Sequence, residues 1–417
     1  MLRPAPAEAV TRDADAGGGE RERTLVWWAL GVAVSSRLFI FLIGFLARST
    51  LPILQPHLSV VAQPSVLYRG AVGRLLDGWA SYDAGWYLDI AQHGYVHFRS
   101  EAFFPLYPLL VHLLGSSGMG YTPAGIVVSL ACFVAAAMLL YRLTADVLGA
   151  RAALWTVVFL SIAPTSFFFQ AIYTESLFLL VSVALFFFAQ RRQWLLAGLM
   201  GLLATLTRST GVVLAVPLAL FYLQSVDWQW RRIRAGILSV LLVPCGLAVY
   251  MAYLWSARGN PLLFAGAQHS WGRYFALPYV TVWNGLRDGY RGGGYVVAHD
   301  GFSHLSVRLW QNSAGVADLI NLVALAIAAA LIALASRRLA APYTAYAVLA
   351  LIFLLCNPVA RQPLMSLPRF ALVVFPLFMA LAACTERRPL IRALVVGVCL
   401  VGLAWLTARF VLFAWVA

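Results

Sequence analysis

Residues 176–188 read SLFLLVSVALFFF, a run in which only two serines interrupt large apolar side chains. Similar runs recur along the 417-residue chain, which is 62% hydrophobic and 11% charged. A soluble domain carries roughly a quarter charged residues. Because backbone N–H and C=O groups in lipid must be satisfied within the segment, repeated runs of this kind are typical of transmembrane helices. The composition therefore predicts an all-α polytopic membrane protein.

The lengths of the apolar runs set the expected number of crossings. Spanning hydrocarbon takes about 20 apolar residues, which predicts about eleven helices, within about ten to thirteen. The expected segments are 25–47, 122–141, 152–169, 171–190, 194–207, 209–224, 235–256, 315–335, 343–358, 371–384 and 391–414. The short run 102–114 contains Pro105 and Pro108 and is interpreted as interfacial or re-entrant, with a further crossing as the alternative. The segments 194–207 and 209–224 are alternatively half-helices that meet at Arg208.

The net charge of +14 comes largely from arginine clusters between the apolar runs. These clusters lie at 191–192, 231–234, 337–338 and 387–388. Cationic residues in short loops mark the cytoplasmic side of a membrane protein, and this distribution argues against nucleic-acid binding. With the clusters inside, the turn at 169–176 and Arg208 face outward. Three loops also become extracytoplasmic: 48–101, 257–314 and 359–370.

The sequence predicts a terminal tail followed by one domain. Residues 1–24 are predicted to form a disordered cytoplasmic tail, and residues 25–417 a single integral-membrane domain. The five cysteines show neither CxxC nor Cys/His spacing, so neither a disulfide framework nor a zinc site is indicated. No Walker loop, dinucleotide fingerprint or HExxH motif is present. We therefore expect neither a metal nor another cofactor.

The polar residues of the first outer loop concentrate in residues 79–108, WASYDAGWYLDIAQHGYVHFRSEAFFPLYP. A short helix is predicted from Asp83, which places Asp83 and Asp89 about 120° apart and not as a carboxylate pair. Asp89 stands four residues before His93, a spacing that allows contact on a helix. The structural alternatives are a helix N-cap for Asp83 and a fixed partner role for Asp89. Trp86 and Tyr87 are candidate ligand-stacking residues or simply interfacial aromatics.

Two ionisable residues interrupt later apolar runs. Glu175 heads the run 176–188, and Arg208 lies in TRSTG between two apolar segments. A guanidinium at membrane depth costs several kcal/mol unless it is paired. Pairing with a carboxylate such as Glu175, or with a lipid phosphate, would explain Arg208. A purely structural ion pair is the alternative.

The two later outer loops add more candidates. GAQHSWGRY contains Gln268, Trp271 and Arg273, and LPRFALVVFP places Arg369 at the mouth of a predicted span. Guanidinium groups bind phosphate oxygens bidentately, so several arginines on one surface favour a polyprenyl phosphate ligand. A contact with lipid headgroups is the alternative for each arginine alone.

The first-loop stretch resembles a family motif. WASYDAGWYLDIAQHGY followed by AFFPLYPLL is similar to the first-loop motif of the PIG-V group, the GPI mannosyltransferase II family and its bacterial relatives. IAPTSFFFQAIYTESLF and TRSTG are similar to further blocks of that family. The resemblance implies a GT-C-type helix bundle with a long first extracytoplasmic loop carrying short interfacial helices. It also implies a glycosyltransferase that uses a polyprenyl-phosphate sugar.

The expected reaction moves a hexose, for which the resemblance favours mannose, to an acceptor hydroxyl on the extracytoplasmic side with inversion. A phosphate leaving group is weakly basic, so one carboxylate suffices, and Asp83 is the expected general base. Arg208 and Arg369 are expected to hold the donor phosphate, with Glu175 orienting Arg208 or binding the sugar. The full set of expected substrate-binding residues is Asp89, Trp86, Tyr87, His93, Glu175, Arg208, Gln268, Trp271, Arg273 and Arg369.

The cell context and the partners are also expectations. The chain is rich in Ala and Arg and contains no lysine, which is typical of a high-GC bacterium and favours the bacterial plasma membrane. The expected partners are membrane lipids, the polyprenyl-phosphate sugar and a glycolipid, glycan or protein acceptor. The alternatives are a transporter or flippase for lipid-linked sugars, and a GT-C transferase of another sugar.

Overall fold

The computed structural model describes residues 8–53, 68–291, 314–414 and 416. Residues 1–7 of the predicted tail lie outside the described residues, as do 54–67 and 292–313 of the two longest predicted outer loops. Helix α1 (Glu8–Thr50) begins inside the segment predicted to be disordered, so the structure differs there from the expected tail. The described part of the chain is helical, apart from turns and two isolated β-bridges.

Helices and turns alternate along the described chain. After α1 come two groups of α-helices. The first group is α2 (Gly70–Leu76), α3 (Ala84–His93), α4 (Leu106–Leu114), α5 (Tyr121–Leu148), α6 (Ala150–Ile162), α7 (Glu175–Gln190), α8 (Trp194–Thr207), α9 (Ala215–Ser225) and α10 (Ser239–Arg258). The second is α11 (Leu263–Ser270), α12 (Pro278–Gly289), α14 (Ala314–Arg338), α15 (Ala341–Leu355), α16 (Leu367–Ala371), α17 (Pro376–Thr385) and α18 (Pro389–Val411).

Five of these helical segments are long and apolar enough to cross a membrane by themselves. They are Arg23–Thr50, Tyr121–Leu148, Ala235–Arg258, Ala317–Arg338 and Pro389–Val411. Shorter apolar helices cover the other expected spans. The protein is therefore an integral membrane protein built from helices, and the total of about eleven crossings remains a prediction.

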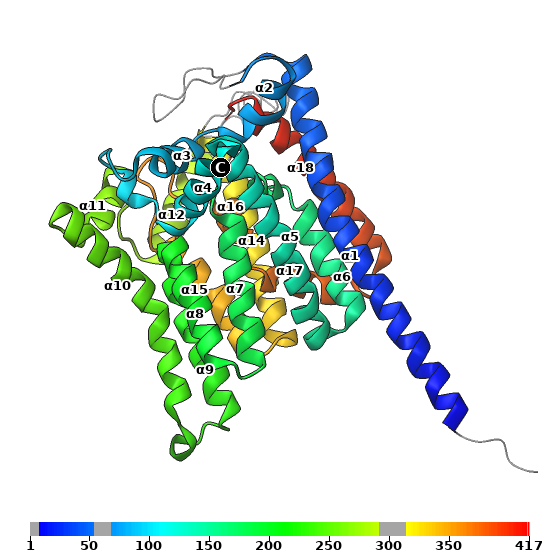
Figure 1. Cartoon of the computed structure of the whole chain (residues 1–417). Helices are drawn as coiled ribbons and strands as arrows, with labels where there is room; N and C mark the ends of the chain where they lie inside the picture. The colour runs from blue at the N-terminus through cyan, green and yellow to red at the C-terminus, as the bar shows by residue number, and fades with distance from the viewer. Residues whose placement is uncertain (1–7, 54–67, 292–313, 415, 417) are drawn as a thin grey trace, which may run out of the picture.

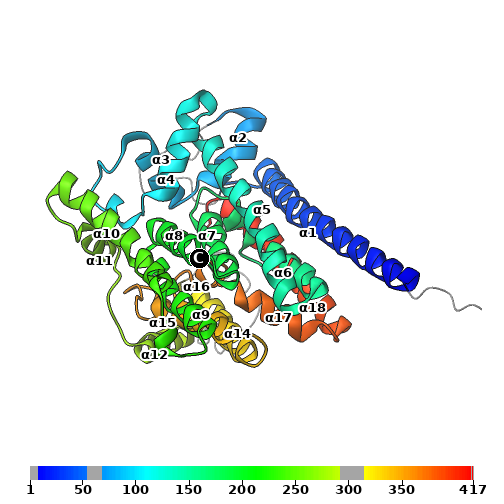
Figure 2. The ribbon, with the colours of Figure 1, turned by 60° about the horizontal axis from the view of Figure 1, so that its bottom comes forward.

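The polar first loop covers one end of the helix bundle. In Figure 1, α2, α3 and α4 lie together at the top, whereas the turn that joins α9 to α10 lies at the opposite end. The view of Figure 2 keeps α7 in the interior, between α5 and α8. Most side chains of α7 are buried, as expected for a helix that is apolar on every side. The first residue of this central helix is Glu175.

Several predicted segments break where the sequence contains proline or a polar residue. α6 ends at Ile162, before Pro164, so the predicted span 152–169 is shorter. Residues 163–174 form turns and the short 3-10 helix η4 (Ser166–Phe169). α4 has only 9 residues, and its placement as an interfacial or re-entrant segment remains a prediction. α8 and α9 are separated at Arg208, whose backbone is extended (φ −154°, ψ 144°). The predicted break at Arg208 is therefore confirmed, and whether the two segments are half-helices or separate crossings remains a prediction.

Close packing of α8 on α10 depends on glycines. A Cβ at Gly201 would lie 2.5 Å from a methyl carbon of Val243, and a Cβ at Gly246 would clash with the carbonyl oxygen of Leu202. Small residues allow the backbones of two membrane helices to approach closely. Because the obstacle at Gly246 is backbone, the helices themselves would have to move to accept a side chain.

Replacing Gly246 by leucine should therefore lower the free energy of unfolding by about 1–3 kcal/mol, the usual range for overpacking. The matched control is Gly31→Leu in α1, where no atom lies within 4 Å of the added Cβ. Thermal unfolding in detergent measures both. Equal midpoints for the two variants would show that α8 and α10 do not pack as described.

Candidate functional site

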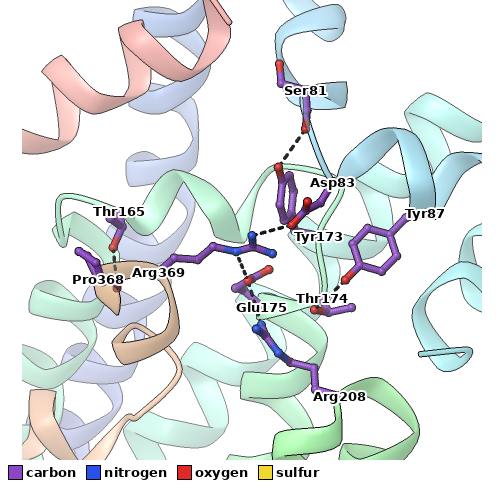
Figure 3. Close-up of polar contacts among 10 residues, drawn as sticks. All are labelled: Ser81, Asp83, Tyr87, Thr165, Tyr173, Thr174, Glu175, Arg208, Pro368 and Arg369. Atoms are coloured by element: carbon purple, nitrogen blue, oxygen red, sulfur yellow. Dashed lines mark hydrogen bonds and ion pairs between the residues drawn. The ribbon is translucent and has the colours of Figure 1, made fainter. Parts of the chain in front are cut away.

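The first residue of α7, Glu175, is a completely buried carboxylate. Its Oε1 atom accepts a hydrogen bond from NH1 of Arg208 at 2.8 Å and another from Nε of Arg369 at 2.6 Å. Figure 3 shows both guanidinium groups approaching this side chain. A carboxylate at a helix N-terminus is also favoured by the helix dipole. One oxygen atom therefore joins arginines that stand 161 positions apart in the sequence.

The break between α8 and η5 (Ser209–Leu214) places Arg208. The N–H of Gly211 donates to the carbonyl oxygen of Arg208 at 2.9 Å, which closes a tight turn. A Cβ at Gly211 would lie 2.6 Å from the backbone of Ala204, so the turn requires glycine. The predicted pairing of Arg208 with Glu175 is confirmed by the distance above.

Arg369 continues the set of ion pairs toward the first loop. It lies in α16, and its NH1 donates to Oδ2 of Asp83 at 2.7 Å. Its guanidinium carbon also lies 4.4 Å from the ring centroid of Tyr173. Asp83, Arg369, Glu175 and Arg208 thus form one connected series, which we call the ion-pair ladder (Figure 3).

Asp83 occupies the N-cap position of α3, but its side chain makes no capping hydrogen bond. The N-cap alternative for its carboxylate is therefore not realised. The side chain of Asp83 is 30% exposed, whereas that of Glu175 is fully buried. Among the described residues, the Oδ1 atom of Asp83 receives no hydrogen bond. Asp83 is thus the carboxylate of the ladder that an external molecule can reach.

A third predicted arginine lies beside the ladder. The ring centroid of Phe370 is 4.8 Å from the guanidinium carbon of Arg208, 5.5 Å from that of Arg369 and 5.6 Å from that of Arg273. Burial lowers the pKa of Arg273 to about 10, and the charge of Asp83 opposes this shift. Arg273 therefore stays positive at neutral pH. Three guanidiniums against two carboxylates leave one net positive charge in this part of the site.

This convergence tests the predicted arrangement of the loops. Asp83 comes from the loop predicted at 48–101, Arg273 from 257–314 and Arg369 from 359–370. Their contacts with one another and with Phe370 place the three loops at one end of the bundle. The shared end is confirmed, and the compartment that it faces remains a prediction.

Aromatic side chains pack against one another close to the ladder. Trp86 stacks on Phe103 at 5.7 Å between centroids and meets Trp271 edge-on at 5.5 Å. Tyr87 lies 3.4 Å from Thr174, oxygen to oxygen, directly before Glu175 in the sequence. Burial, followed by the charge of Glu175, raises the pKa of Tyr87 to about 12. Tyr87 therefore offers a neutral hydroxyl and is no base at neutral pH.

Three predicted residues have their recorded contacts away from the ladder. Nδ1 of His93 lies 3.0 Å from Oδ1 of Asp89, which confirms the predicted i, i+4 contact. Nε2 of His97 lies 3.6 Å from the other oxygen of Asp89. Gln268 donates to the carbonyl oxygen of Ala102 at 3.3 Å. The structure records no bond from Asp89, His93 or Gln268 to the ladder among the described residues, so their substrate-binding roles remain predictions.

Two residues of the site were not among the predicted ones. Tyr173 donates from its hydroxyl to the carbonyl oxygen of Ser81 at 2.9 Å and places its ring against Arg369. Phe370 contacts all three arginines. Tyr173 stands in the polar stretch before Glu175, which was a usable signal. Phe370 is one of 25 phenylalanines, and nothing in the sequence distinguishes it from the others.

Metal-binding side chains are scattered over the described residues, where no group of three or more His, Cys, Asp or Glu is arranged to hold a metal ion. The expectation that no cofactor is used remains a prediction.

Comparisons with known proteins agree with the motif. The profile of the family described as Mannosyltransferase (PIG-V) matches residues 29–256, more than half of the chain. GPI alpha-1,6-mannosyltransferase 2 of Cricetulus griseus is 27% identical over 288 residues, which cover 63% of this chain and 56% of that protein. GPI mannosyltransferase 2 of Schizosaccharomyces pombe is 24% identical over 280 residues, which cover 58% and 59%. The chain thus spans little more than half the length of these relatives.

A solved structure shows a more distant likeness. ArnT from Cupriavidus metallidurans, solved with undecaprenyl phosphate bound, gives a TM-score of 0.47 at 15% identity, over 89% of this chain and 62% of that chain.

Removing the charge of Glu175 tests the ladder. Glu175→Gln leaves the guanidiniums of Arg208 and Arg369 without their buried counter-ion, so the free energy of unfolding should fall by about 3–5 kcal/mol. The control is Glu386→Gln, an exposed position at the end of α17. Thermal unfolding of both variants measures the difference. Equal stability would contradict a bridging role for Glu175.

Proposed function

This chain belongs to the mannosyltransferase (PIG-V) family, and on that premise we propose that it transfers a mannosyl residue from a polyprenyl phosphate to an acceptor hydroxyl. The proposed architecture is a GT-C-type bundle of about eleven spans, with the site on the extracytoplasmic face of a bacterial plasma membrane. The acceptor is a glycolipid, a glycan or a protein hydroxyl.

The accessibility of Asp83 is the observation that carries the proposal. Its side chain is 30% exposed, one oxygen is held by Arg369 and the other receives no hydrogen bond among the described residues. A general base must come within hydrogen-bond reach of the proton that it removes. Glu175 is completely buried behind the two arginines and lacks that access.

The proposed reaction is a single displacement. The acceptor oxygen attacks the anomeric carbon as its proton passes to Oδ1 of Asp83. The bond between the anomeric carbon and the phosphate oxygen breaks, and its electron pair leaves with the polyprenyl phosphate. The anomeric configuration is inverted. Because the second pKa of a phosphate monoester is near 6, the leaving group needs no proton from the protein.

The arginines of the ladder are proposed to stabilise that leaving group. Arg208 and Arg369 each use part of their guanidinium to bind Glu175, which leaves further N–H donors for phosphate oxygens. Phosphate charge grows as the bond breaks, and preorganised donors in a buried site lower the energy of such a transition state. The net positive charge of the site favours the anion before and after transfer.

Arg369 is proposed to couple donor binding to the base. In the structure its NH1 donates to Asp83. The same guanidinium is proposed to bind the phosphate. A bound phosphate competes with Asp83 for these donors. Loss of the Arg369 bond would leave both oxygens of Asp83 free to accept a hydrogen bond when the donor is in place. The aromatic side chains Trp86 and Trp271 are proposed to contact the sugar.

Replacing Asp83 by asparagine should lower transfer by at least about 10²-fold, since general-base catalysis contributes roughly 10² to 10⁴. Asp288→Asn is the control, because the Asp288 side chain is also 30% exposed and also pairs with an arginine, at 3.3 Å. Transfer from polyprenyl-phosphate mannose is measured with purified protein in detergent. Unchanged transfer by Asp83→Asn would remove Asp83 from the role of base.

The same assay separates an enzyme from a lipid-linked sugar transporter. Detergent micelles contain no two compartments, so a transporter forms no new glycosidic bond there. Formation of a mannoside by the native chain supports the transferase. Absence of product with every acceptor class would contradict it.

Replacing Arg208 by alanine should lower kcat/KM for the donor by about 10²- to 10³-fold, the usual effect of losing one donor to a transition-state oxyanion. Arg232→Ala, which breaks an exposed ion pair with Asp227, is the control. Initial rates over a range of donor concentrations measure both variants. Equal kcat/KM values would show that Arg208 has only a structural role.

A further inference from the structure

A long cavity of about 620 Å³ lies on the membrane-facing side of α14, α17 and α18. Figure 2 shows α17 between the other two helices. Exposed apolar side chains form its edges: Val323 is 61% and Ile327 55% exposed on α14, and Val398 is 63% exposed on α18. In a membrane these edges face lipid, so the cavity is open to a molecule that arrives through the bilayer. We call it the α14–α18 groove.

The groove is long and has unequal ends. On α14 its lining runs from Ala317 to Leu331, which corresponds to about 21 Å at the helical rise. On α18 it runs from Leu394 to Arg409, nearly the same length. Its polar lining side chains are Thr165, Asn321, Gln362 and Arg409, and those on α14 and α18 lie toward the Ala317 and Arg409 end. Hydrocarbon at one end and polar groups at the other match an amphipathic lipid.

The side-chain amide nitrogen of Gln362, at the polar end, has no hydrogen-bond acceptor among the described residues. The Gln362 side chain is 7% exposed. A buried amide N–H without an acceptor costs about 1–3 kcal/mol. A ligand with acceptor oxygens at this end of the groove would satisfy it. A hydrocarbon chain alone would not.

The polar end also adjoins the ladder. Pro368 lines the groove and directly precedes Arg369, and Thr165 donates to the carbonyl oxygen of Pro368 at 3.3 Å. Arg409 lines the groove and lies within electrostatic range of Tyr82, the residue before Asp83. The groove therefore ends beside the sequence neighbours of both Asp83 and Arg369.

We propose that the α14–α18 groove binds the isoprenoid chain of the lipid phosphate donor, with Gln362 and Arg409 at the point where the phosphate leaves the hydrocarbon and turns toward Arg369. This inference rests on the proposed function. It assigns to the last helices of the chain, which lie beyond the family match at 29–256, the recognition of the lipid part of the substrate.

Photolabelling tests the position of the chain without any sugar transfer. The probe is a polyprenyl phosphate with a diazirine about 20 Å along the chain from the phosphate, which matches the length of the groove, added to the purified protein in detergent. Mass spectrometry should place the label on α14 and α18, near Ile327 and Leu394, and unlabelled polyprenyl phosphate should displace it. Labelling elsewhere, or equal displacement by phosphatidylglycerol, would overturn the proposal.

Variants of the groove give a second, independent readout. Ala324→Trp, with Val398→Trp as a second variant, should weaken binding of a long-chain polyprenyl phosphate by at least about tenfold, or ~1.4 kcal/mol, and leave geranyl phosphate within about twofold. Ala326→Trp on the exposed side of α14 is the control and should change neither. Equal losses of affinity for the long-chain and the geranyl phosphate, or no loss of affinity, would contradict binding of the isoprenoid chain in the groove. Binding is measured without turnover. Absence of mannosyl transfer would therefore refute the proposed function, whereas the binding data would still test the groove.

Discussion

The site depends on one buried oxygen atom. Glu175 Oε1 accepts hydrogen bonds from Arg208 and Arg369, and without it two guanidiniums would repel each other in a region that is shielded from water. A buried charge is tolerated only when it is paired and hydrogen-bonded. Glu175 therefore connects Arg208, at the break after α8, to Arg369 in α16. Arg369 in turn donates a hydrogen bond to Asp83. The chain breaks after α8 and before α7 place Arg208 and Glu175 where they can pair.

The surroundings fit a site for an anion with a sugar and a lipid chain. Three arginines around Phe370 supply positive charge, Trp86 and Trp271 pack against each other, and the α14–α18 groove is proposed to hold hydrocarbon. Each element of this set comes from a different part of the chain. The carboxylate of Asp83 is the more exposed of the two carboxylates in the ladder.

The helical class and the main polar residues could be predicted from the sequence because each depends on neighbouring residues in the chain. A guanidinium in an apolar run needs a counter-ion, so Arg208 predicted its pairing with Glu175, and a spacing of four predicted Asp89 beside His93. The bond from Arg369 to Asp83 joins residues 286 positions apart, and no local rule selects that partner. The contact of Phe370 with three arginines could not be predicted either, because these residues also lie far apart in the sequence.

The most direct measurement is a structure of the protein with polyprenyl phosphate bound. The account predicts phosphate oxygens within about 3 Å of nitrogen atoms of Arg208 and Arg369. It also predicts that the side chain of Asp83 is released from Arg369 and that the isoprenoid chain lies along α14 and α18. A phosphate bound elsewhere, with the bond from Arg369 to Asp83 intact, would contradict it.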